Sequence, residues 1–157
     1  MRLMQNRTPD TRPRYRERLS PSLRLLVTVA LAGPMVSLVF VPIGATVALV
    51  AGAAVSAALL ALFVWLAPVV SVEGGVLRSG RAHIDVRFLG DPRALTGDEA
   101  RQARGPLLPA RGWHLIRGGI DGLVVVPNTD EDDPVDSWTI SSRTPDRLAA
   151  AIRAAQS

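Results

Sequence analysis

One stretch of the chain, residues 25–72, contains no charged side chain and is rich in Leu, Val and Ala, whereas charged residues are frequent on both sides of it. A helix rises about 1.5 Å per residue, so one helix over this stretch would be roughly twice as long as the ~30 Å hydrocarbon core of a bilayer. Two helices of about 20 residues each would match that thickness. The pattern therefore predicts a transmembrane hairpin over residues 23–68, with helices at 23–41 and 45–67.

The reversal of this hairpin is expected at residues 42–44, Pro42-Ile43-Gly44. Proline cannot continue the hydrogen-bond ladder of a helix, and glycine tolerates the backbone angles of a tight connection. Pro34 lies inside the first helix and should kink it, which membrane helices accept when a neighbouring helix shields the freed carbonyl group. Small residues that suggest such a contact are Gly33, Ser37, Ala48, Gly52 and Ser56. The abundance of alanine in the chain explains this spacing equally well.

From Val69 onward the apolar period shortens to two residues, as in strands. In "RAHIDVRFL", Ile84, Val86 and Phe88 alternate with polar residues, and further short strands are expected at 113–116, 122–126 and 137–142. Thr96 and Glu99 form a capping-box pattern before a short helix, and Thr144-Pro145 opens a final helix over 146–155. The sequence predicts a small α+β domain over residues 69–157, built as a bent antiparallel sheet or open barrel with a C-terminal helix.

The net charge of +4 is unevenly divided along the chain. Residues 1–24 carry seven arginines against two acidic residues, or +5, whereas residues 73–157 carry eleven arginines against twelve acidic residues, or −1. The basic character belongs to the tail at 1–22, for which we expect no regular structure, and the C-terminal part offers no one-signed surface to nucleic acid. The absence of cysteine excludes disulfides, Cys-ligated zinc and thiol catalysis.

Arginine placement also predicts an orientation. Arginines precede the first apolar helix and follow the second one closely, but the turn between them has none. Under the positive-inside rule, both termini of a two-span protein would then be cytoplasmic. The use of arginine without lysine is typical of a GC-rich bacterial genome, so we expect a bacterial plasma membrane, with Tyr15 and Trp65 as interfacial anchors. A cleavable signal is disfavoured because the apolar run continues past the cleavage-like residues 54–57.

Four segments carry a resemblance to a known family: "YRERL" at Tyr15–Leu19, "VRFLG" at Val86–Gly90, the acidic loop, and "SWTISSRTPDRLAAAI" at Ser137–Ile152. They resemble an actinobacterial membrane family catalogued as domain of unknown function 3093, over Tyr15 to about Ala154. The distinctive C-terminal positions are Trp138, Ser141, Arg143 and Pro145. This chain departs at Asp136-Ser137, where the family has Pro-Tyr. The resemblance implies two spans and a domain like the bacterial pleckstrin-homology (PH) domains, and it implies no activity.

His83, Asp85 and Arg87 share one face of a predicted strand, where His beside Asp could act as an acid/base pair or contribute to a metal site. The polar face of any half-exposed strand shows the same pattern, because alternate residues point to solvent. No second histidine lies nearby in sequence, and His114 falls in another strand. An enzyme or enzyme subunit that uses this face is therefore the alternative to a non-enzymatic function.

Residues 130–133 and Asp136 form an acidic loop, but its spacing lacks the glycine and glutamate of an EF-hand. No base stands at an informative distance from Ser141 or Ser142, and no glycine loop has a phosphate-binding motif. The sequence therefore predicts no catalytic residue, metal or cofactor.

Trp138 is expected to pack inward, and Arg143 to point outward, where it could pair with an acidic group or a lipid headgroup. We expect an integral membrane protein whose partners are the bilayer and an unidentified membrane or cytosolic protein, with a domain that docks a protein or a lipid headgroup.

Overall fold

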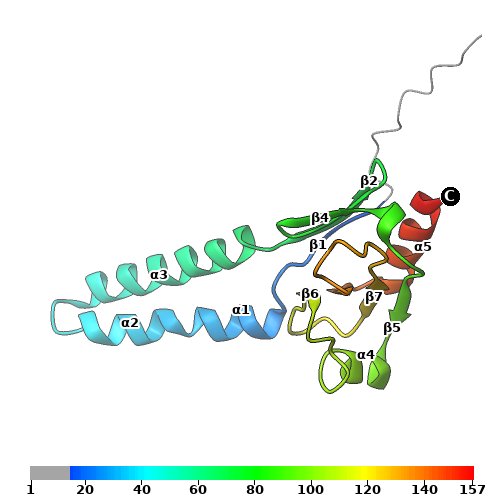
Figure 1. The fold of residues 1–157 in the computed structure, drawn as a ribbon. Coiled ribbons are helices and arrows are strands. Elements are labelled where there is room, and N and C mark those ends of the chain that lie inside the picture. Colours follow the sequence, from blue (N-terminus) through cyan, green and yellow to red (C-terminus); the bar gives the residue numbers. More distant parts are fainter. Residues whose placement is uncertain (1–14) are drawn as a thin grey trace, which may run out of the picture. The chain divides into compact units, whose positions relative to one another are not determined.

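The computed structural model describes residues 15–157, which divide into two compact units (Figure 1). The first unit, here called the β-domain, comprises residues 15–19, 68–116 and 120–157. The second, here called the hairpin, comprises residues 20–67 together with 117–119. The β-domain is therefore built from chain segments that lie on both sides of the hairpin in the sequence.

The hairpin has a first arm made of α1 (Leu23–Ala30) and α2 (Ala32–Phe40) and a second arm made of α3 (Ala45–Trp65). The two arms run side by side (Figure 1). Both arms, Leu23–Phe40 and Ala45–Trp65, are long and apolar enough to cross a membrane. Only 6% of the most apolar stretch of the first arm and 11% of that of the second arm are buried, whereas the core helix of a water-soluble protein is mostly buried.

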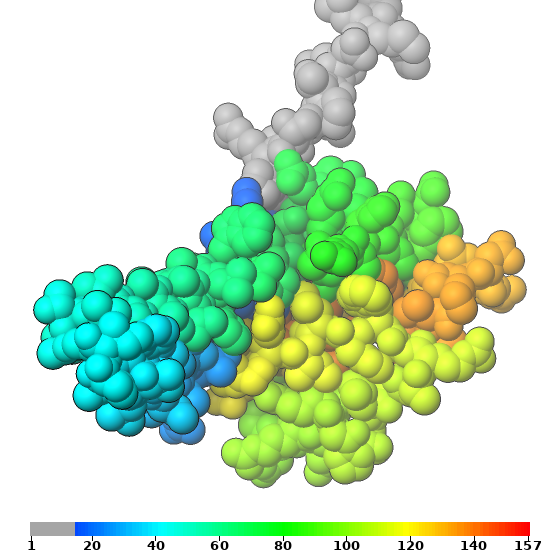
Figure 2. Space-filling view, turned by 90° about the vertical axis from the view of Figure 1, so that its left-hand side faces the viewer, coloured from blue at the N-terminus to red at the C-terminus, as the bar shows by residue number. Residues whose placement is uncertain are grey.

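The chain reverses between Phe40 and Ala45, at the predicted turn. The amide of Ile43 donates to the carbonyl oxygen of Phe40 at 3.0 Å. Gly44 has a φ of 152°, which residues with a side chain rarely adopt, and it directly precedes α3. The end of the hairpin that holds this turn is the cyan part of Figure 2. Both arms begin at the expected residues and end within two residues of the expected ones.

Pro34 interrupts the first arm. Proline has no amide hydrogen, so the carbonyl oxygen of Ala30, four residues earlier, loses its helical partner. The hydroxyl of Ser56 on α3 donates to that oxygen at 3.1 Å. The neighbouring helix therefore satisfies the carbonyl group that the proline frees, and the first arm is interrupted only at Leu31, between α1 and α2.

The two arms approach each other closely at two glycines. Gly33 and Gly52 are both buried, and a methyl group on Gly52 would collide with the hydroxyl of Ser37 and lie 2.6 Å from the carbonyl oxygen of Gly33. A methyl group on Gly33 would likewise lie 2.8 Å from the carbonyl oxygen of Gly52. The small residues of the two arms thus face one another, and this backbone contact has no room for a side chain.

The β-domain contains two sheets. The first has the order β1-β2-β3-β4 and is antiparallel throughout, and the second has the order β5-β7-β8-β6. The strands of the first sheet are β1 (Tyr15–Arg18), β2 (Val69–Glu73), β3 (Val76–Ser79) and β4 (Ala82–Asp85). Those of the second are β5 (Arg93–Leu95), β6 (Gly112–Leu115), β7 (Leu123–Pro127) and β8 (Ser137–Ser141).

Two helices complete the β-domain, α4 (Gly97–Ala103) and α5 (Pro145–Gln156). One apolar cluster joins both sheets to α5, which places Leu148 and Ile152 in the core without any exposed surface. A smaller cluster formed by Leu95, Ala100 and Leu123 lies under α4. The α+β class expected from the sequence is observed, with α5 closing the main core.

The segment before the hairpin differs from the expectation. Residues 1–14 lie outside the described part, but Tyr15–Arg18, expected within an unstructured tail, forms β1 and pairs with β2 from Tyr15↔Val72 to Arg18↔Val69. The ladder continues in a 2.9 Å hydrogen bond from the amide of Leu19 to the carbonyl oxygen of Pro68. The hairpin is therefore inserted between two neighbouring strands, and residues 69–157 alone lack one strand of the first sheet.

Two further expectations were wrong. The strand expected to continue through Phe88 ends at Asp85, because the Asp85 carboxylate accepts the amide of Arg87 at 3.1 Å and caps a short 3₁₀ helix over Val86–Phe88. The second sheet is not purely antiparallel, because β8 inserts between β7 and β6 and runs parallel to β6. β5 was not anticipated from the sequence.

Candidate functional site

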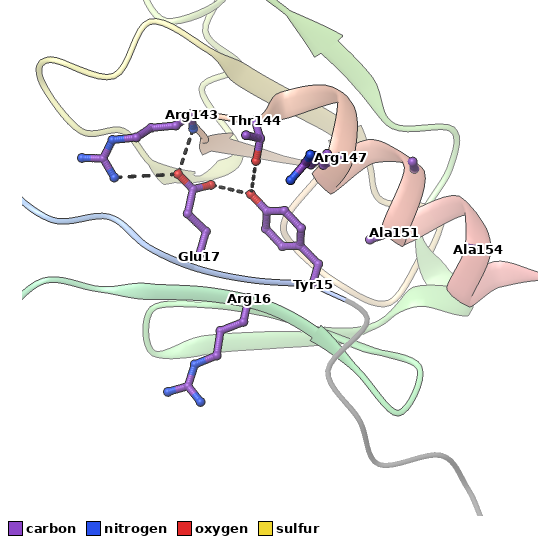
Figure 3. Close-up of a pocket in the computed structure, with 9 residues that line it drawn as sticks. Tyr15, Arg16, Glu17, Arg143, Thr144, Arg147, Ala151 and Ala154 are labelled. Carbon is purple, nitrogen blue, oxygen red and sulfur yellow. Dashed lines mark hydrogen bonds and ion pairs between the residues drawn. The ribbon is translucent and has the colours of Figure 1, made fainter.

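Two of the four segments that carry the family resemblance, more than a hundred residues apart in sequence, meet inside the β-domain. Strand alternation turns Tyr15 and Glu17 of β1 to the half-buried side and Arg16 to the exposed side. Opposite Tyr15 and Glu17 lies the connection from β8 to α5, formed by Ser142, Arg143 and Thr144 (Figure 3). We call this contact the β1–α5 latch and define it by these five residues: Tyr15, Glu17, Ser142, Arg143 and Thr144.

Glu17 is the acceptor at the centre of the latch. Its carboxylate accepts hydrogen bonds from the Tyr15 hydroxyl at 2.5 Å, the Ser142 hydroxyl at 2.7 Å and the Arg143 amide at 2.9 Å. The Arg143 guanidinium lies 3.9 Å from the same carboxylate and also donates to the carbonyl oxygen of Arg18. With a side chain only 13% exposed, Glu17 directs its charge toward these donors rather than into solvent.

Tyr15 links the same carboxylate to the start of α5. Its hydroxyl lies 3.0 Å from both the Ser142 and the Thr144 hydroxyl oxygens. Partial burial, followed by the hydrogen bond to the Glu17 carboxylate, raises the pKa of Tyr15 above its ordinary value. A phenol with a raised pKa keeps its proton and acts as a hydrogen-bond donor, so Tyr15 is suited to holding Glu17 rather than to accepting protons.

The latch also changes how α5 begins. Thr144 occupies the N-cap position with Pro145 after it, as predicted, but makes no side-chain capping bond to the helix. Its amide instead donates to the Ser142 hydroxyl at 3.0 Å, and its own hydroxyl faces Tyr15. The start of α5 is therefore fixed by β1 as well as by local chain geometry.

An open groove of about 940 Å³ runs beside the latch, between β1 and α5. Its lining comprises Tyr15, Arg16, Glu17, Arg143, Thr144, Arg147, Ala150, Ala151 and Ala154. Figure 3 shows Arg147 on the same side of β1 as Tyr15, whereas the guanidinium of Arg16 lies on the opposite side of the strand. Arg143 and Arg147, against one engaged carboxylate, give the groove a net positive charge, and Arg16 adds a further charge from the opposite side of β1.

The exposed charged groups that line the groove beside the latch are guanidinium groups. Ser142, the only serine beside the carboxylate, has no exposed surface and is therefore closed to a substrate. No group of three or more His, Asp or Glu side chains within residues 15–157 is placed to hold a metal ion. Guanidinium groups beside a groove are instead suited to carboxylate or phosphate ligands.

The residues of the alternative site lie in different elements: His83 is within β4, Asp85 ends that strand, and Arg87 belongs to the 3₁₀ helix that follows. His83 is exposed on β4 opposite Arg78. The Asp85 carboxylate contacts Arg87 through the backbone amide and, at 3.4 Å, through the guanidinium, which itself lies 4.6 Å from the Phe88 ring centre. Asp85 thus caps a turn, and an enzymatic function for these residues stays an untested alternative.

Trp138 packs into the core beside Ile140, with 4% of its surface exposed. Its ring centre lies 5.8 Å from that of Trp113 on the adjacent strand β6. His114, next to Trp113, is half-buried in the same sheet. These residues support the β-domain from within, and they do not line the groove.

The acidic loop between β7 and β8 stands out from the surface in Figure 2, where it is orange. Its polar side chains accept hydrogen bonds from the loop's own backbone. The side-chain oxygens of Asn128, Asp130 and Asp133 each accept one from the amide two residues later, at Asp130, Asp132 and Val135 respectively. The loop is therefore organised by side-chain-to-backbone turns.

Sequence reasoning singled out Arg143 but not its partners. Glu17 stands in the "YRERL" segment of the family resemblance and among the charges of the tail, and no contact was predicted for it, whereas Tyr15 was predicted to lie at the membrane interface. The alternation in Tyr15-Arg16-Glu17-Arg18 would have been the one local sign of a strand with a two-residue period. Arg147 gave no signal, since one arginine on the exposed side of a helix is common.

Comparison with known proteins agrees with the resemblance seen in the sequence. Residues 14–152 match the sequence model of the family described as protein of unknown function (DUF3093), which includes both halves of the latch. No curated protein matches the chain, and no solved structure does. Since the match covers nearly the whole chain, the protein belongs to the DUF3093 family.

Proposed function

We propose that this chain is an integral protein of a bacterial plasma membrane, in which the two arms of the hairpin span the bilayer and the β-domain is a non-enzymatic interaction module at the cytoplasmic surface. The β-domain would dock a ligand or protein through the groove beside the latch. A PH-like fold is part of this proposal, supported by two sheets closed by a C-terminal helix, although the parallel pair β6–β8 departs from a simple antiparallel barrel.

The pairing of β1 with β2 carries this proposal. Arg18 and Val69 are partners in one antiparallel ladder, and they flank the two ends of the hairpin in the sequence. Strands of one sheet lie on the same side of a membrane, so the chain between them crosses an even number of times or not at all. Two arms of membrane-spanning length satisfy this condition, whereas a single crossing would separate β1 from β2.

The surface of the hairpin supports the membrane location. Leu38, Val39, Leu49 and Val50 are each at least 64% exposed, and the other large apolar residues of both arms continue the same surface. A contiguous apolar surface of this extent is unfavourable in water and favourable in the hydrocarbon core of a bilayer. Six arginines before the first arm, a seventh at its second residue, Arg24, and none in the turn favour a cytoplasmic β-domain.

Single-cysteine labelling tests this topology, because the natural chain has no cysteine. The variant Ile43→Cys places a thiol in the turn, and Asp132→Cys places one in the acidic loop, where both positions are exposed. We expect a membrane-impermeant maleimide added to intact spheroplasts to label Ile43→Cys but not Asp132→Cys. Permeabilising the membrane should then allow Asp132→Cys to react.

The control is Ser157→Cys, at the exposed end of α5, which should behave like Asp132→Cys. Labelling of the acidic-loop and C-terminal thiols from outside, with the turn protected, would reverse the orientation. Equal labelling of all three from one side, or release of the protein by alkaline carbonate, would refute the spanning hairpin.

A further inference from the structure

We infer that the groove between β1 and α5 binds the phosphate of an anionic phospholipid headgroup. This inference rests on the proposed function, since it names a ligand class and a site for the proposed interaction module. Four features of the β-domain lead to it: the charge of the groove, the engagement of its single carboxylate, the composition of its floor and its place in the chain.

The charge of the groove favours an anion. Arg143 and Arg147 lie on the α5 side. Arg16 lines the groove from β1, and its guanidinium adds a positive charge from the opposite side of that strand. The only acidic residue among the lining residues is Glu17. Its carboxylate already accepts three hydrogen bonds and lies 3.9 Å from the Arg143 guanidinium, so it does not neutralise Arg16 or Arg147. No ion pair recorded within residues 15–157 involves these two arginines.

The floor of the groove has room for more than an ion. Arg147, Ala150, Ala151 and Ala154 follow one another at helical spacing and share one face of α5. Three alanines keep this face shallow and supply no competing polar group. A phosphate held by a guanidinium group could therefore lie beside a glycerol or acyl segment in contact with the methyl groups.

The closeness of the groove residues on β1 to the first arm in the sequence favours a bilayer lipid over other anions. Arg16 stands seven positions before Leu23, where the first arm begins, so a spanning hairpin would keep β1 near the headgroups. The cytoplasmic leaflet of a membrane carries anionic lipids that attract nearby arginines. The chain's own residues 1–14 are an unsuitable occupant, because they carry four arginines and one aspartate and have the same sign of charge as the groove.

Amide NMR on the full chain in nonionic detergent micelles tests the inference. Dihexanoylphosphatidylglycerol is the probe, with dihexanoylphosphatidylcholine and inorganic phosphate as parallel titrations. We expect saturable shifts of the amides of Arg147, Ala151 and Ala154 with phosphatidylglycerol and much weaker ones with the other two. An arginine near an anionic surface contributes roughly a five-fold factor in binding, so Arg16→Gln combined with Arg147→Gln should weaken binding about 30-fold.

The matched control removes two exposed arginines of the β-domain outside the groove, Arg81→Gln with Arg101→Gln, and should bind as the unaltered chain does. A lysine pair at positions 16 and 147 should retain most of the affinity, because it keeps the charge. The spectrum of each variant reports whether the β-domain is folded.

Equal binding of phosphatidylcholine, an unchanged affinity of the Arg16→Gln/Arg147→Gln variant, or an equal loss in the control would overturn the inference. Saturation by inorganic phosphate at the same concentration would assign the groove to a free anion instead of a lipid. These results are independent of the labelling experiment, so a spanning hairpin with an inert groove would refute the lipid site alone.

Discussion

Replacing Glu17 by alanine should loosen β1 from the β-domain. The Glu17 carboxylate accepts three hydrogen bonds, and a bond to a charged group contributes about 1.5–3 kcal/mol. The three do not simply add. Water can reach the Arg143 amide because Arg143 is exposed, and Tyr15 keeps its contacts with Ser142 and Thr144. The ion pair at 3.9 Å involves an Arg143 side chain that is 44% exposed, and such pairs add less than about 1 kcal/mol.

The free energy that holds β1 in place should therefore fall by about 2 kcal/mol, close to the value of one charged hydrogen bond with a buried donor. Because β1 is the edge strand of its sheet, this loss should appear first as local opening of β1. Hydrogen–deuterium exchange of the full chain should then be about 30-fold faster over β1 and its partner residues on β2. Glu17→Gln, which keeps one acceptor oxygen, should give a smaller increase.

Glu73→Ala is the matched control, since it removes a glutamate from the neighbouring strand β2 at an exposed position. Its exchange over β1 should remain close to that of the unaltered chain. If Glu17→Ala changes exchange over β1 by less than a factor of about two, or if Glu73→Ala has the same effect, the latch does not hold this strand and the reasoning fails.

Three other predictions concern Tyr15, the glycine contact of the hairpin and the pairing of β1 with β2. Tyr15 is the only tyrosine, so near-ultraviolet absorbance should show tyrosinate forming above the ordinary pKa, and Glu17→Gln should bring that pKa partly down. Because the pKa of Tyr15 is raised in the folded state, its contribution to the free energy of unfolding is complete below pH ~10 and falls as the pH rises further. Denaturation curves of Tyr15→Phe should lack this fall. Gly52→Val should destabilise the hairpin in micelles by roughly 1–3 kcal/mol, as measured by thermal melting, whereas Ala54→Val on the exposed side of α3 should not. A fragment of residues 68–157 should give dispersed NMR peaks only when residues 15–19 are joined to it by a flexible linker, and dispersion without them would contradict the role of β1.

The two apolar helices and the turn between them could be predicted from the sequence because length and local chemistry decide them. Uncharged residues over two bilayer-spanning lengths leave few alternatives, and Pro42 and Gly44 permit the turn between them. The effect of Pro34 was predictable for the same reason, since a missing amide hydrogen always frees a carbonyl group. Only the identity of its new partner, Ser56, required the structure.

The latch could not be predicted, because its parts are joined by long-range contacts. Arginine alternates with Tyr15 and Glu17 over residues 15–18, but this alternation gives no apolar face. The segment is a strand because Val69–Val72 offers a ladder on its edge. The outward position of Arg143 could be expected from strand alternation, but its contact with Glu17 depends on that ladder. Locally, "VRF" looked like the continuation of a strand, and the capping bond of Asp85 ended it instead.

The insertion of the hairpin between β1 and β2 has a consequence for biosynthesis. During translation, β1 leaves the ribosome first and has no partner until both arms and residues 69–73 have been made. In the proposed topology, the first sheet can close only after the second arm has returned the chain to the cytoplasmic side. Completion of the β-domain would then report correct insertion, and a chain whose hairpin failed to insert properly would expose the unpaired edge of β2, a surface that quality-control proteases and chaperones can recognise.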